Sequence, residues 1–325
     1  MGRSEGLTSA PAHRPTTTQP RSMRQSSSPR RARVSTLGRS RSTGFLYVVP
    51  ALLFVLVFVT SPFLHMVWVS FNSWTLITPP SFVGLRNYAN AFADSQFWVS
   101  LTFTLKYTIL ITPILMIGGY LIALLTSTNS PLTRFTRTVV FTPVVIGLGA
   151  SSFLWYWLFS VNYGLVNRLL VDIGIIDRPL LWLGVDANLS NWAVIISVVW
   201  KVLGFGMILF VAAIHAIPDE VNEAAMVDGA AFWQRVRKII LPLTRRTILL
   251  VTLISVIGSL LAFDQFYIMT AGQPRNLTAT SVFYVYLNSF PYLKLGYGAA
   301  LSMILAVIVL AFTVFQLILT RRSAT

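Results

Sequence analysis

The chain has 325 residues, of which 55% are hydrophobic and only 11% are charged, and it carries a formal net charge of +15. Soluble domains usually contain about 25% charged residues, so the composition predicts an integral membrane protein and excludes a large additional catalytic domain. The absence of cysteine excludes disulfides, thiolate metal sites and cysteine nucleophiles.

Residues 1–44 form a basic N-terminal tail with nine arginines and one acidic residue, Glu5. The tail is rich in Ser, Thr, Pro and Arg, so it cannot bury enough apolar surface to offset its chain entropy, and we expect it to be disordered. It has neither the amphipathic stripe of an organellar transit peptide nor the interleaved aromatic residues of a nucleic-acid-binding segment. We therefore expect no nucleic-acid partner and assign the tail a role in orienting the first membrane helix.

Six apolar stretches between residues 45 and 320 predict six transmembrane helices and an all-α integral membrane fold. Pro62, Pro113 and Pro143 lie inside the first, second and third stretches, where we expect kinks. Residues 321–325 then form a short end beyond the last span. The predicted spans are 45–71, 101–126, 138–159, 192–216, 248–269 and 298–319.

Lysine and arginine residues are distributed unequally between the two sides of this six-span plan. The side that includes both termini holds 18 of them and the other side holds five, while Lys106 and Lys201 lie inside spans. Positive residues accumulate on the cytoplasmic side of membrane proteins. Both termini and the connection 217–246 are therefore predicted to be cytoplasmic, in a multi-pass protein of the cell membrane.

The connection 217–246 is too long for a simple turn between two helices, so we expect it to have a structure of its own. Pro218 fits the first position of a short helix, and the two acidic residues after it suit the positive end of that helix. Gly229 can adopt the positive φ found where helices end, and a second helical stretch, 232–241, is expected to close at Pro242. The pattern predicts a helix, a glycine turn and a second helix.

Two interpretations of this connection remain open on its residues alone. Ala224 and Ala225 are small enough to let another protein approach closely, and Glu223 offers a carboxylate to a basic partner, so the first helix could be a docking element. Alternatively, the connection is an amphipathic segment on the membrane surface, where basic residues such as Arg235 and Lys238 contact lipid phosphates.

The spacing of the residues in this connection resembles the EAA loop of binding-protein-dependent ABC transporter permeases at every defining position. Two further stretches, 82–88 and 263–270, resemble segments of the carbohydrate-uptake group of that family, which includes the maltose and glycerol-3-phosphate permeases, and the chain resembles the first-type permease partner. The usual Gly-Gly-Gly-Pro after the second stretch is replaced by Ala-Gly-Gln-Pro at 271–274. The EAA-like positions are Glu223, Ala224, Ala225, Asp228, Gly229, Ile239, Leu241 and Pro242.

The resemblance implies a MetI-like permease fold over residues 45–320, with 217–246 as the cytoplasmic coupling loop. In that family the loop inserts into a cleft of a cytoplasmic ATPase, so the EAA-like residues are the expected ATPase contact. The resemblance also implies four kinds of partner: a second permease subunit, two ATP-binding cassette subunits, an external solute-binding protein and membrane lipid. ATP and Mg²⁺ would be bound by the ATPase, and we expect no cofactor in this chain.

Polar residues at membrane depth are costly and mark candidate positions for the solute pathway. Asp264 is the strongest candidate, because Gln265 and Tyr267 beside it can also hydrogen-bond a sugar hydroxyl. Lys201 lies near the middle of the fourth span, next to Trp200, and it could line the same pathway. Alternatively, Asp264 and Lys201 pair with each other, since charges inside a membrane usually find a partner.

The sequence contains no phosphate-binding loop of the G-x-x-x-x-G-K-[ST] kind, so another subunit must handle ATP. We therefore expect a non-enzymatic permease subunit of an ATP-driven importer, with a sugar, polyol or glycerol phosphate as its solute. One alternative is an ion-coupled secondary transporter in which Asp264 and Lys201 form a relay. A second alternative is a membrane scaffold that uses its basic tail to hold partners.

Overall fold

The computed structural model describes residues 41–75 and 77–322 in two units, Met1–Val55 and Leu56–Thr325, which are treated separately. The described part of the first unit is helix α1 (Arg41–Val55). The predicted N-terminal tail lies outside the described residues except for its last four positions, which are helical. Residues 323–325 of the predicted C-terminal end also lie outside them.

The described part of the second unit is helical apart from one short hairpin, in which strand β1 (Asn72–Ser73) pairs antiparallel with β2 (Ser81–Phe82). Asn72 lies opposite Phe82. The helices, with π-helical segments named η, are η1 (Leu56–Thr60), α2 (Ser61–Ser70), α3 (Arg86–Ala93), α4 (Ser95–Leu125), α5 (Pro131–Val145), α6 (Leu148–Leu158), α7 (Leu165–Asp172), α8 (Ala187–His215), α9 (Asp219–Val227), α10 (Phe232–Arg235), η2 (Val236–Ile240), α11 (Leu241–Leu243), α12 (Arg245–Leu260), α13 (Asp264–Met269), α14 (Ser281–Ser289) and α15 (Leu295–Arg322).

Four helical segments within the described residues are long and apolar enough to cross a membrane, and two bent helix pairs raise the total to six if each pair is one span. The continuous segments correspond to the first, second, fourth and sixth predicted spans. The bent pairs are α5 with α6, at 101°, and α10–α11 with α12, at 70°. The four continuous segments are Tyr47–Ser70, Ser95–Leu125, Ala187–His215 and Leu295–Ile318.

The third predicted span, 138–159, is not one continuous helix. Pro143 has no backbone N–H, so the carbonyl of Val139 loses its normal partner in the helix. Three residues later Ile146 is extended, with a ψ of 136°, and α6 begins only after Gly147. The expected kink at Pro143 is therefore a complete break in the helix. Pro113, by contrast, lies inside the continuous helix α4, and Pro62 lies in the first turn of α2.

The fifth predicted span, 248–269, is also interrupted. Helix α12 ends at Leu260, and Phe263 lies outside the helical region with a φ of −136° before α13 begins at Asp264. The hydroxyl of Thr280 donates a 2.6 Å hydrogen bond to the carbonyl of Ala262. This bond satisfies a backbone acceptor that the interruption exposes, which lets the chain leave the helix at membrane depth.

Helices α4 and α8 form the centre of the second unit. Tyr107 and Ile111 of α4 pack with Val194 and Val198 of α8 in a buried apolar cluster. Further along both helices, a Cβ atom on Gly119 would lie only 3.3 Å from the backbone nitrogen of residue 207 on α8. The glycine therefore lets the two helices approach closely, as small residues do between membrane helices.

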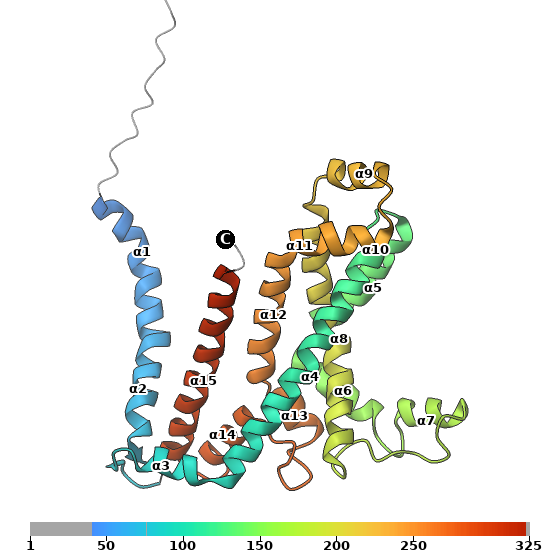
Figure 1. The fold of residues 1–325 in the computed structure, drawn as a ribbon. Coiled ribbons are helices and arrows are strands. Elements are labelled where there is room, and N and C mark those ends of the chain that lie inside the picture. The colour runs from blue at the N-terminus through green and yellow to red at the C-terminus, as the bar shows by residue number, and fades with distance from the viewer. Residues whose placement is uncertain (1–40, 76, 323–325) are drawn as a thin grey trace, which may run out of the picture. The chain divides into compact units, whose positions relative to one another are not determined.

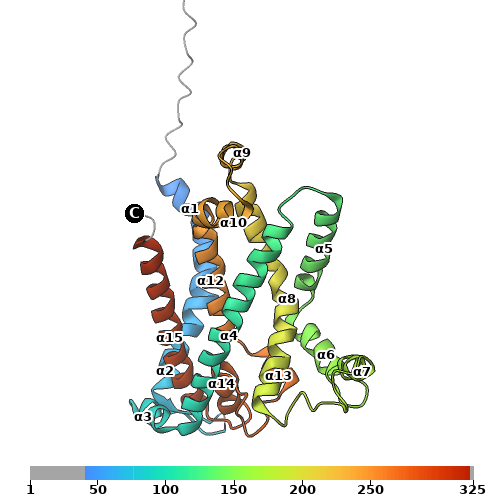
Figure 2. The same ribbon diagram turned by 45° about the vertical axis from the view of Figure 1, so that its right-hand side comes forward.

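Figures 1 and 2 place α9 and the C-terminal end of α15 at one end of the second unit and α3, α7 and α14 at the opposite end. We call these the α9 end and the α7 end. Helices between them expose large apolar side chains, including Ile109 at 71% and Phe153 at 64% exposure. An apolar surface of this kind is expected for helices that contact lipid.

At the α7 end, the carboxylate of Asp94 joins three helices. It accepts the backbone N–H of Gln96 at 2.9 Å, which caps α4, and the hydroxyls of Tyr284 in α14 and Tyr297 in α15 at 2.6 Å each. Partial burial acts to raise the pKa of Asp94, but these hydrogen bonds outweigh it and hold the pKa below its ordinary value. Burial and the bond to Asp94 raise the pKa of Tyr284 to about 12.

Candidate functional site

The connection between α8 and α12 projects from the α9 end as a helix, a glycine turn and a second helical stretch (Figure 1). Pro218 is the N-cap of α9. Gly229 has a φ of 78°, and its N–H and that of Ala230 bond back to the carbonyls of Met226 and Ala225, at 3.0 and 2.9 Å, which closes α9. The predicted arrangement of the connection is therefore confirmed.

The second helical stretch does not close at Pro242 as predicted. It continues through α10, η2 and α11 to Leu243, so the proline lies inside it. A proline ring normally clashes with the carbonyl four residues earlier, which here lies in η2, and the wider π-turn of that segment accommodates the ring. The chain then bends by 70° into α12.

Most of the EAA-like residues lie on the outer surface of this connection. Glu223, Ala224, Asp228 and Gly229 are exposed, as are Leu241 and Pro242 farther on, whereas Ala225 is buried. Large apolar side chains are exposed around them: Val227 at 88% and Trp233 at 65%. The loop thus presents a carboxylate, small residues and an apolar surface together.

The base of the loop is fixed to the helix bundle. Val236 and Ile240 of η2 are buried with Phe210 of α8. The buried hydroxyl of Thr244 lies 3.0 Å from the hydroxyl of Tyr120 in α4 and donates to the carbonyl of Ile240 at 2.8 Å. The loop is therefore presented from a rigid support, which the sequence patterns did not reveal.

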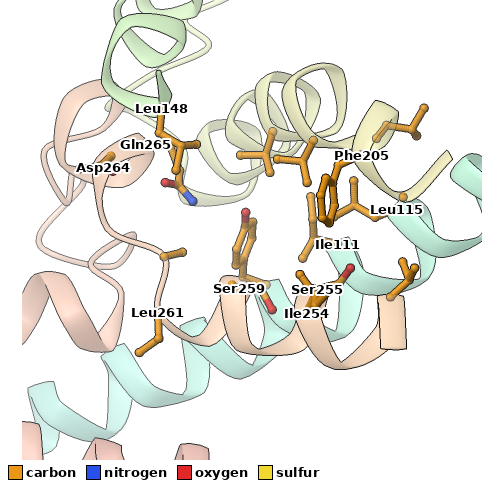
Figure 3. A pocket seen from close by; sticks show the side chains of 18 of the residues that line it. Ile111, Leu115, Leu148, Phe205, Ile254, Ser255, Ser259, Leu261, Asp264 and Gln265 are labelled. Atoms are coloured by element: carbon orange, nitrogen blue, oxygen red, sulfur yellow. The ribbon is translucent and has the colours of Figure 1, made fainter. Parts of the chain in front are cut away.

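A cavity of about 230 Å³ lies between α4, α8, α12 and the segment from Leu261 to Gln265. Its wall is mainly aliphatic, and Leu148 at the start of α6 closes one side (Figure 3). The polar residues that line it are Tyr107, Ser255, Ser259, Asp264 and Gln265.

Asp264 and Gln265, two of the predicted pathway residues, line this cavity. Gln265 is 6% exposed, and Figure 3 shows its amide directed into the space between the helices. The same amide interacts with the hydroxyl of Tyr107. Asp264 and Gln265 therefore place hydrogen-bonding groups at the wall of a mainly apolar chamber. Such an arrangement can orient a partly polar ligand.

The other predicted pathway residues do not line the cavity. Tyr267 is 43% exposed and stacks on Phe263, with ring centroids 5.3 Å apart. Trp200 packs edge-on against Trp155, at 5.7 Å. Both therefore contribute aromatic packing in the described structure.

Lys201 does not pair with Asp264. Within the residues that the structure describes, the ion pair present is that of Arg168 with Asp172. The Lys201 side chain is 7% exposed, and its ammonium group donates a 2.8 Å hydrogen bond to the carbonyl of Val144 in the last turn of α5. The alternative in which Lys201 pairs with Asp264 is therefore wrong, because the broken helix supplies a nearer acceptor.

Three cavity residues that the sequence did not single out are Phe205, Ser255 and Ser259. Phe205 is one of many apolar residues in a span, and serines occur throughout membrane helices, so neither type stands out by composition. Helical spacing from Gln265 could not have located the two serines, because the interruption between Leu260 and Asp264 changes the direction of the chain, and Phe205 lies on another helix, α8.

Comparison with known proteins identifies the family. Residues 107–325, more than half of the chain, match the family described as binding-protein-dependent transport system inner membrane component. The chain belongs to this family. The resemblance to permeases of ABC importers is thereby confirmed, and the protein is a multi-pass permease of the plasma membrane.

The permease is similar to relatives over most of its length. It is 31% identical to the trehalose/maltose transport system permease protein MalF of Thermococcus litoralis, over 86% of this chain and 94% of the relative. It is 32% identical to the lactose transport system permease protein LacF of Rhizobium radiobacter, over 84% and 92%. It is also 30% identical to the sulfoquinovosyl glycerol transport system permease protein SmoG of Agrobacterium fabrum, over 90% and 94%.

The fold of the permease matches solved structures. A chain of a bacterial ABC transporter involved in the import of the acidic polysaccharide alginate superposes with a TM-score of 0.75 at 24% identity, over 86% of this permease and 94% of that chain. A chain of a bacterial alginate ABC transporter in complex with an alginate pentasaccharide-bound periplasmic protein gives a TM-score of 0.76 at 24% identity, over 86% of this permease and 93% of that chain. The predicted MetI-like helical fold is thereby confirmed.

Proposed function

We propose that this permease is one of two membrane subunits of an ATP-driven importer for a sugar or a sugar-like solute, such as an oligosaccharide, a polyol or a glycerol phosphate. The relatives support this solute class, because their names refer to trehalose, maltose, lactose and sulfoquinovosyl glycerol. The observation that carries the proposed mechanism is the exposed α9 turn, in which Glu223 lies beside the apolar Val227.

In this proposal α9 docks in a cleft of a separate ATPase subunit, which binds ATP and Mg²⁺. Glu223 offers its carboxylate to a basic residue of the ATPase, and the small Ala224 allows close approach. Two ATPase subunits provide two clefts, and this chain has one such loop, so a second permease subunit is required. We propose a heterodimer of two different permeases.

The proposed orientation places the α9 end in the cytoplasm, together with both termini, as the distribution of lysine and arginine predicts. The α7 end then faces outward and receives solute from an external binding protein. Support comes from the family description, which refers to binding-protein-dependent transport.

We propose that this chain contributes half of the translocation pathway and that the cavity beside α13 is that half. Asp264 and Gln265 are the groups that would bond solute hydroxyls, since both line the chamber. Tyr267, Lys201 and Trp200 remain proposed pathway residues that act from outside the cavity, by supporting the residues that line it. A closing movement of the ATPase pair would shift α9 and, through α8, the helices around the chamber.

Docking is tested by reversing the charge of Glu223 in the assembled importer. Glu223→Arg is expected to abolish copurification of the ATPase and ATP-driven uptake, because it places a cation against the basic partner. Asp177→Arg is the matched control: it changes the charge by the same amount at an exposed site in the loop after α7. Normal copurification of the ATPase with Glu223→Arg would refute the docking assignment.

ATP dependence separates this proposal from an ion-coupled transporter. Proteoliposomes that contain the complete importer are expected to take up solute only with internal ATP, and an imposed ion gradient should have no effect. Uptake that persists without ATP would favour the ion-coupled alternative. A binding-protein screen with sugars, polyols and glycerol phosphates, read out as stimulation of ATPase activity, would identify the solute.

A further inference from the structure

A second cavity, of about 470 Å³, lies between α4 and α8 toward the α7 end, and it shares no lining residue with the chamber beside α13. From α4 it is lined by residues spaced three or four apart, which share one helix face, including Thr102 and Lys106. From α8 it is lined by residues of the first two turns, including Asn188 and Asn191.

Lys106 is a cation within the membrane-spanning segment Ser95–Leu125. Its side chain is exposed, and within residues 41–75 and 77–322 it forms no ion pair. A charge at this position is costly unless it reaches the interface or meets an opposite charge. The described protein supplies no carboxylate to it, so an anion from outside the chain is the natural partner.

The depth of the cavity matches the edge of the hydrocarbon layer. Helix α8 has 29 residues and is about 43 Å long, whereas the hydrocarbon core is roughly 30 Å thick and is crossed by about 20 residues. If α8 is centred in the membrane, its hydrocarbon segment begins near Asn191. Asn188 therefore lies at the level where lipid headgroups begin. Lys106 lines the same cavity from deeper along α4, and its long side chain can reach that level.

The polar groups of the cavity are incompletely satisfied. Asn191 lines the cavity and is 8% exposed, and its Oδ1 atom is enclosed without a hydrogen-bond partner; rotation of the amide would bring that oxygen to the cavity. An amide oxygen needs a donor, whereas the ammonium group of Lys106 needs an anion. The one acid next to the first turn, Asp186, already caps α8 by accepting the N–H of Leu189 at 2.7 Å. A fitting ligand therefore carries both an anionic oxygen and a hydroxyl group.

The remaining wall is apolar and faces outward from the helices. Trp98 is 46% exposed, Leu277 is 43% exposed and Leu110 is 38% exposed. A soluble anion gains nothing from such a wall, whereas the acyl chains of a lipid cover it. We propose that this cavity binds the phosphoglycerol headgroup of phosphatidylglycerol, with the phosphate at Lys106 and a glycerol hydroxyl donating to Asn191.

The test uses the assembled importer in nanodiscs of equal parts phosphatidylcholine and phosphatidylglycerol, followed by native mass spectrometry of the retained lipid. Wild-type protein is expected to retain phosphatidylglycerol preferentially. Lys106→Gln should lower this retention about fivefold, since one lysine near the membrane surface contributes about that factor. Lys106→Arg keeps the charge and should retain the lipid. Lys294→Gln, at an exposed lysine of the α7 end, should behave like wild type.

A second comparison tests the role of Asn191. Phosphatidylmethanol has the same single charge but no headgroup hydroxyl, so wild-type protein should prefer phosphatidylglycerol over it. Asn191→Leu should remove this preference while Lys106 still holds either lipid. Loss of discrimination in that variant would support the proposed hydroxyl contact, and unchanged discrimination would overturn it.

Three outcomes would overturn the lipid assignment itself. The first is equal retention of phosphatidylglycerol by wild type and Lys106→Gln. The second is displacement of the lipid by excess inorganic phosphate, which would identify the ligand as a soluble anion. The third is efficient cross-linking of Lys106→Cys to the second permease, because the cavity would then be covered by protein.

Discussion

The ammonium nitrogen of Lys201 lies 2.8 Å from the carbonyl oxygen of Val144. This contact joins a buried charge near the middle of α8 to the end of α5, where the helix breaks before α6. Carbonyls at a helix C-terminus lack intrahelical partners and carry partial negative charge. The lysine therefore satisfies an acceptor that the break leaves inside the membrane, and it fixes the position of the break.

Replacing Lys201 is expected to loosen the angle between α5 and α6. In Lys201→Met the carbonyl of Val144 has no donor, so the break is no longer fixed to α8. Spin labels can be placed on cysteines at Val139 and Phe153, which are 51% and 64% exposed, because the chain has no other cysteine. The distance distribution between them should broaden in the variant. An equally narrow distribution in Lys201→Met would show that the hydrogen bond does not hold the break.

Gly204 is expected to tolerate no side chain. A Cβ atom there would overlap the carbonyl oxygen of Val140 and lie 2.9 Å from the Cα atom of Phe141, both backbone atoms of α5 that cannot move aside. Gly204→Ala should lower the free energy of unfolding by about 1–3 kcal/mol, the usual cost of overpacking. Gly258→Ala is the matched control, since no atom lies within 4 Å of its added Cβ. Thermal unfolding of the purified importer measures both, and equal melting temperatures for the two variants would contradict the close approach of α5 and α8.

Asp94→Asn is expected to weaken the connection between α4, α14 and α15. Hydrogen bonds to a charged group contribute about 1.5–3 kcal/mol each, reduced here because Asp94 is partly exposed. The pKa of Asp94 is lowered in the folded state, so its contribution is fully present above the ordinary pKa and is lost as the pH falls through the lowered value.

The difference in melting temperature between wild type and Asp94→Asn should therefore be largest at neutral pH and shrink below about pH 4. Asp177→Asn, at an exposed position, serves as the control. A difference that stays constant down to the lowest pH at which the importer remains intact would show that the carboxylate charge does not stabilise this junction.

Gln265→Leu is expected to weaken solute recognition. The variant keeps the volume of the side chain but removes its hydrogen-bonding groups from the chamber, and one neutral hydrogen bond contributes about 0.5–1.5 kcal/mol. The KM for uptake should rise by up to about tenfold with a smaller change in maximal rate. Trp192→Phe, which changes an exposed residue of α8 outside the cavity, should leave KM unchanged. Equal KM values for Gln265→Leu and wild type would remove Gln265 from the proposed pathway.

The sequence predicted the family, the location of the spans and the helix–glycine–helix loop, because each depends on local signals. Apolar length identifies a span, and Gly229 adopts the positive φ that its position predicted. The four continuous spans were located within six residues at their starts and within one residue at their ends for the same reason.

The sequence could not predict the breaks in the third and fifth spans. Their residues are as apolar as those of a continuous helix, and the interruptions are stabilised by distant partners: Lys201 for one and Thr280 for the other. The alternative of a Lys201–Asp264 pair was wrong for this reason. Pairing between charges involves two side chains, whereas the acceptor of the Lys201 ammonium group is a backbone carbonyl that the broken helix makes available.

The chamber beside α13 has a volume of about 230 Å³, below the roughly 300–1,000 Å³ of pockets that enclose a drug-sized ligand. One chain therefore offers too little room to surround an oligosaccharide, and in the proposed importer the second permease must supply the remaining wall. The two permease chains together then determine which solute is transported. A lineage that acquires a new solute would need matched substitutions in two genes, and exchanging this subunit alone between two importers should impair transport of both cargoes.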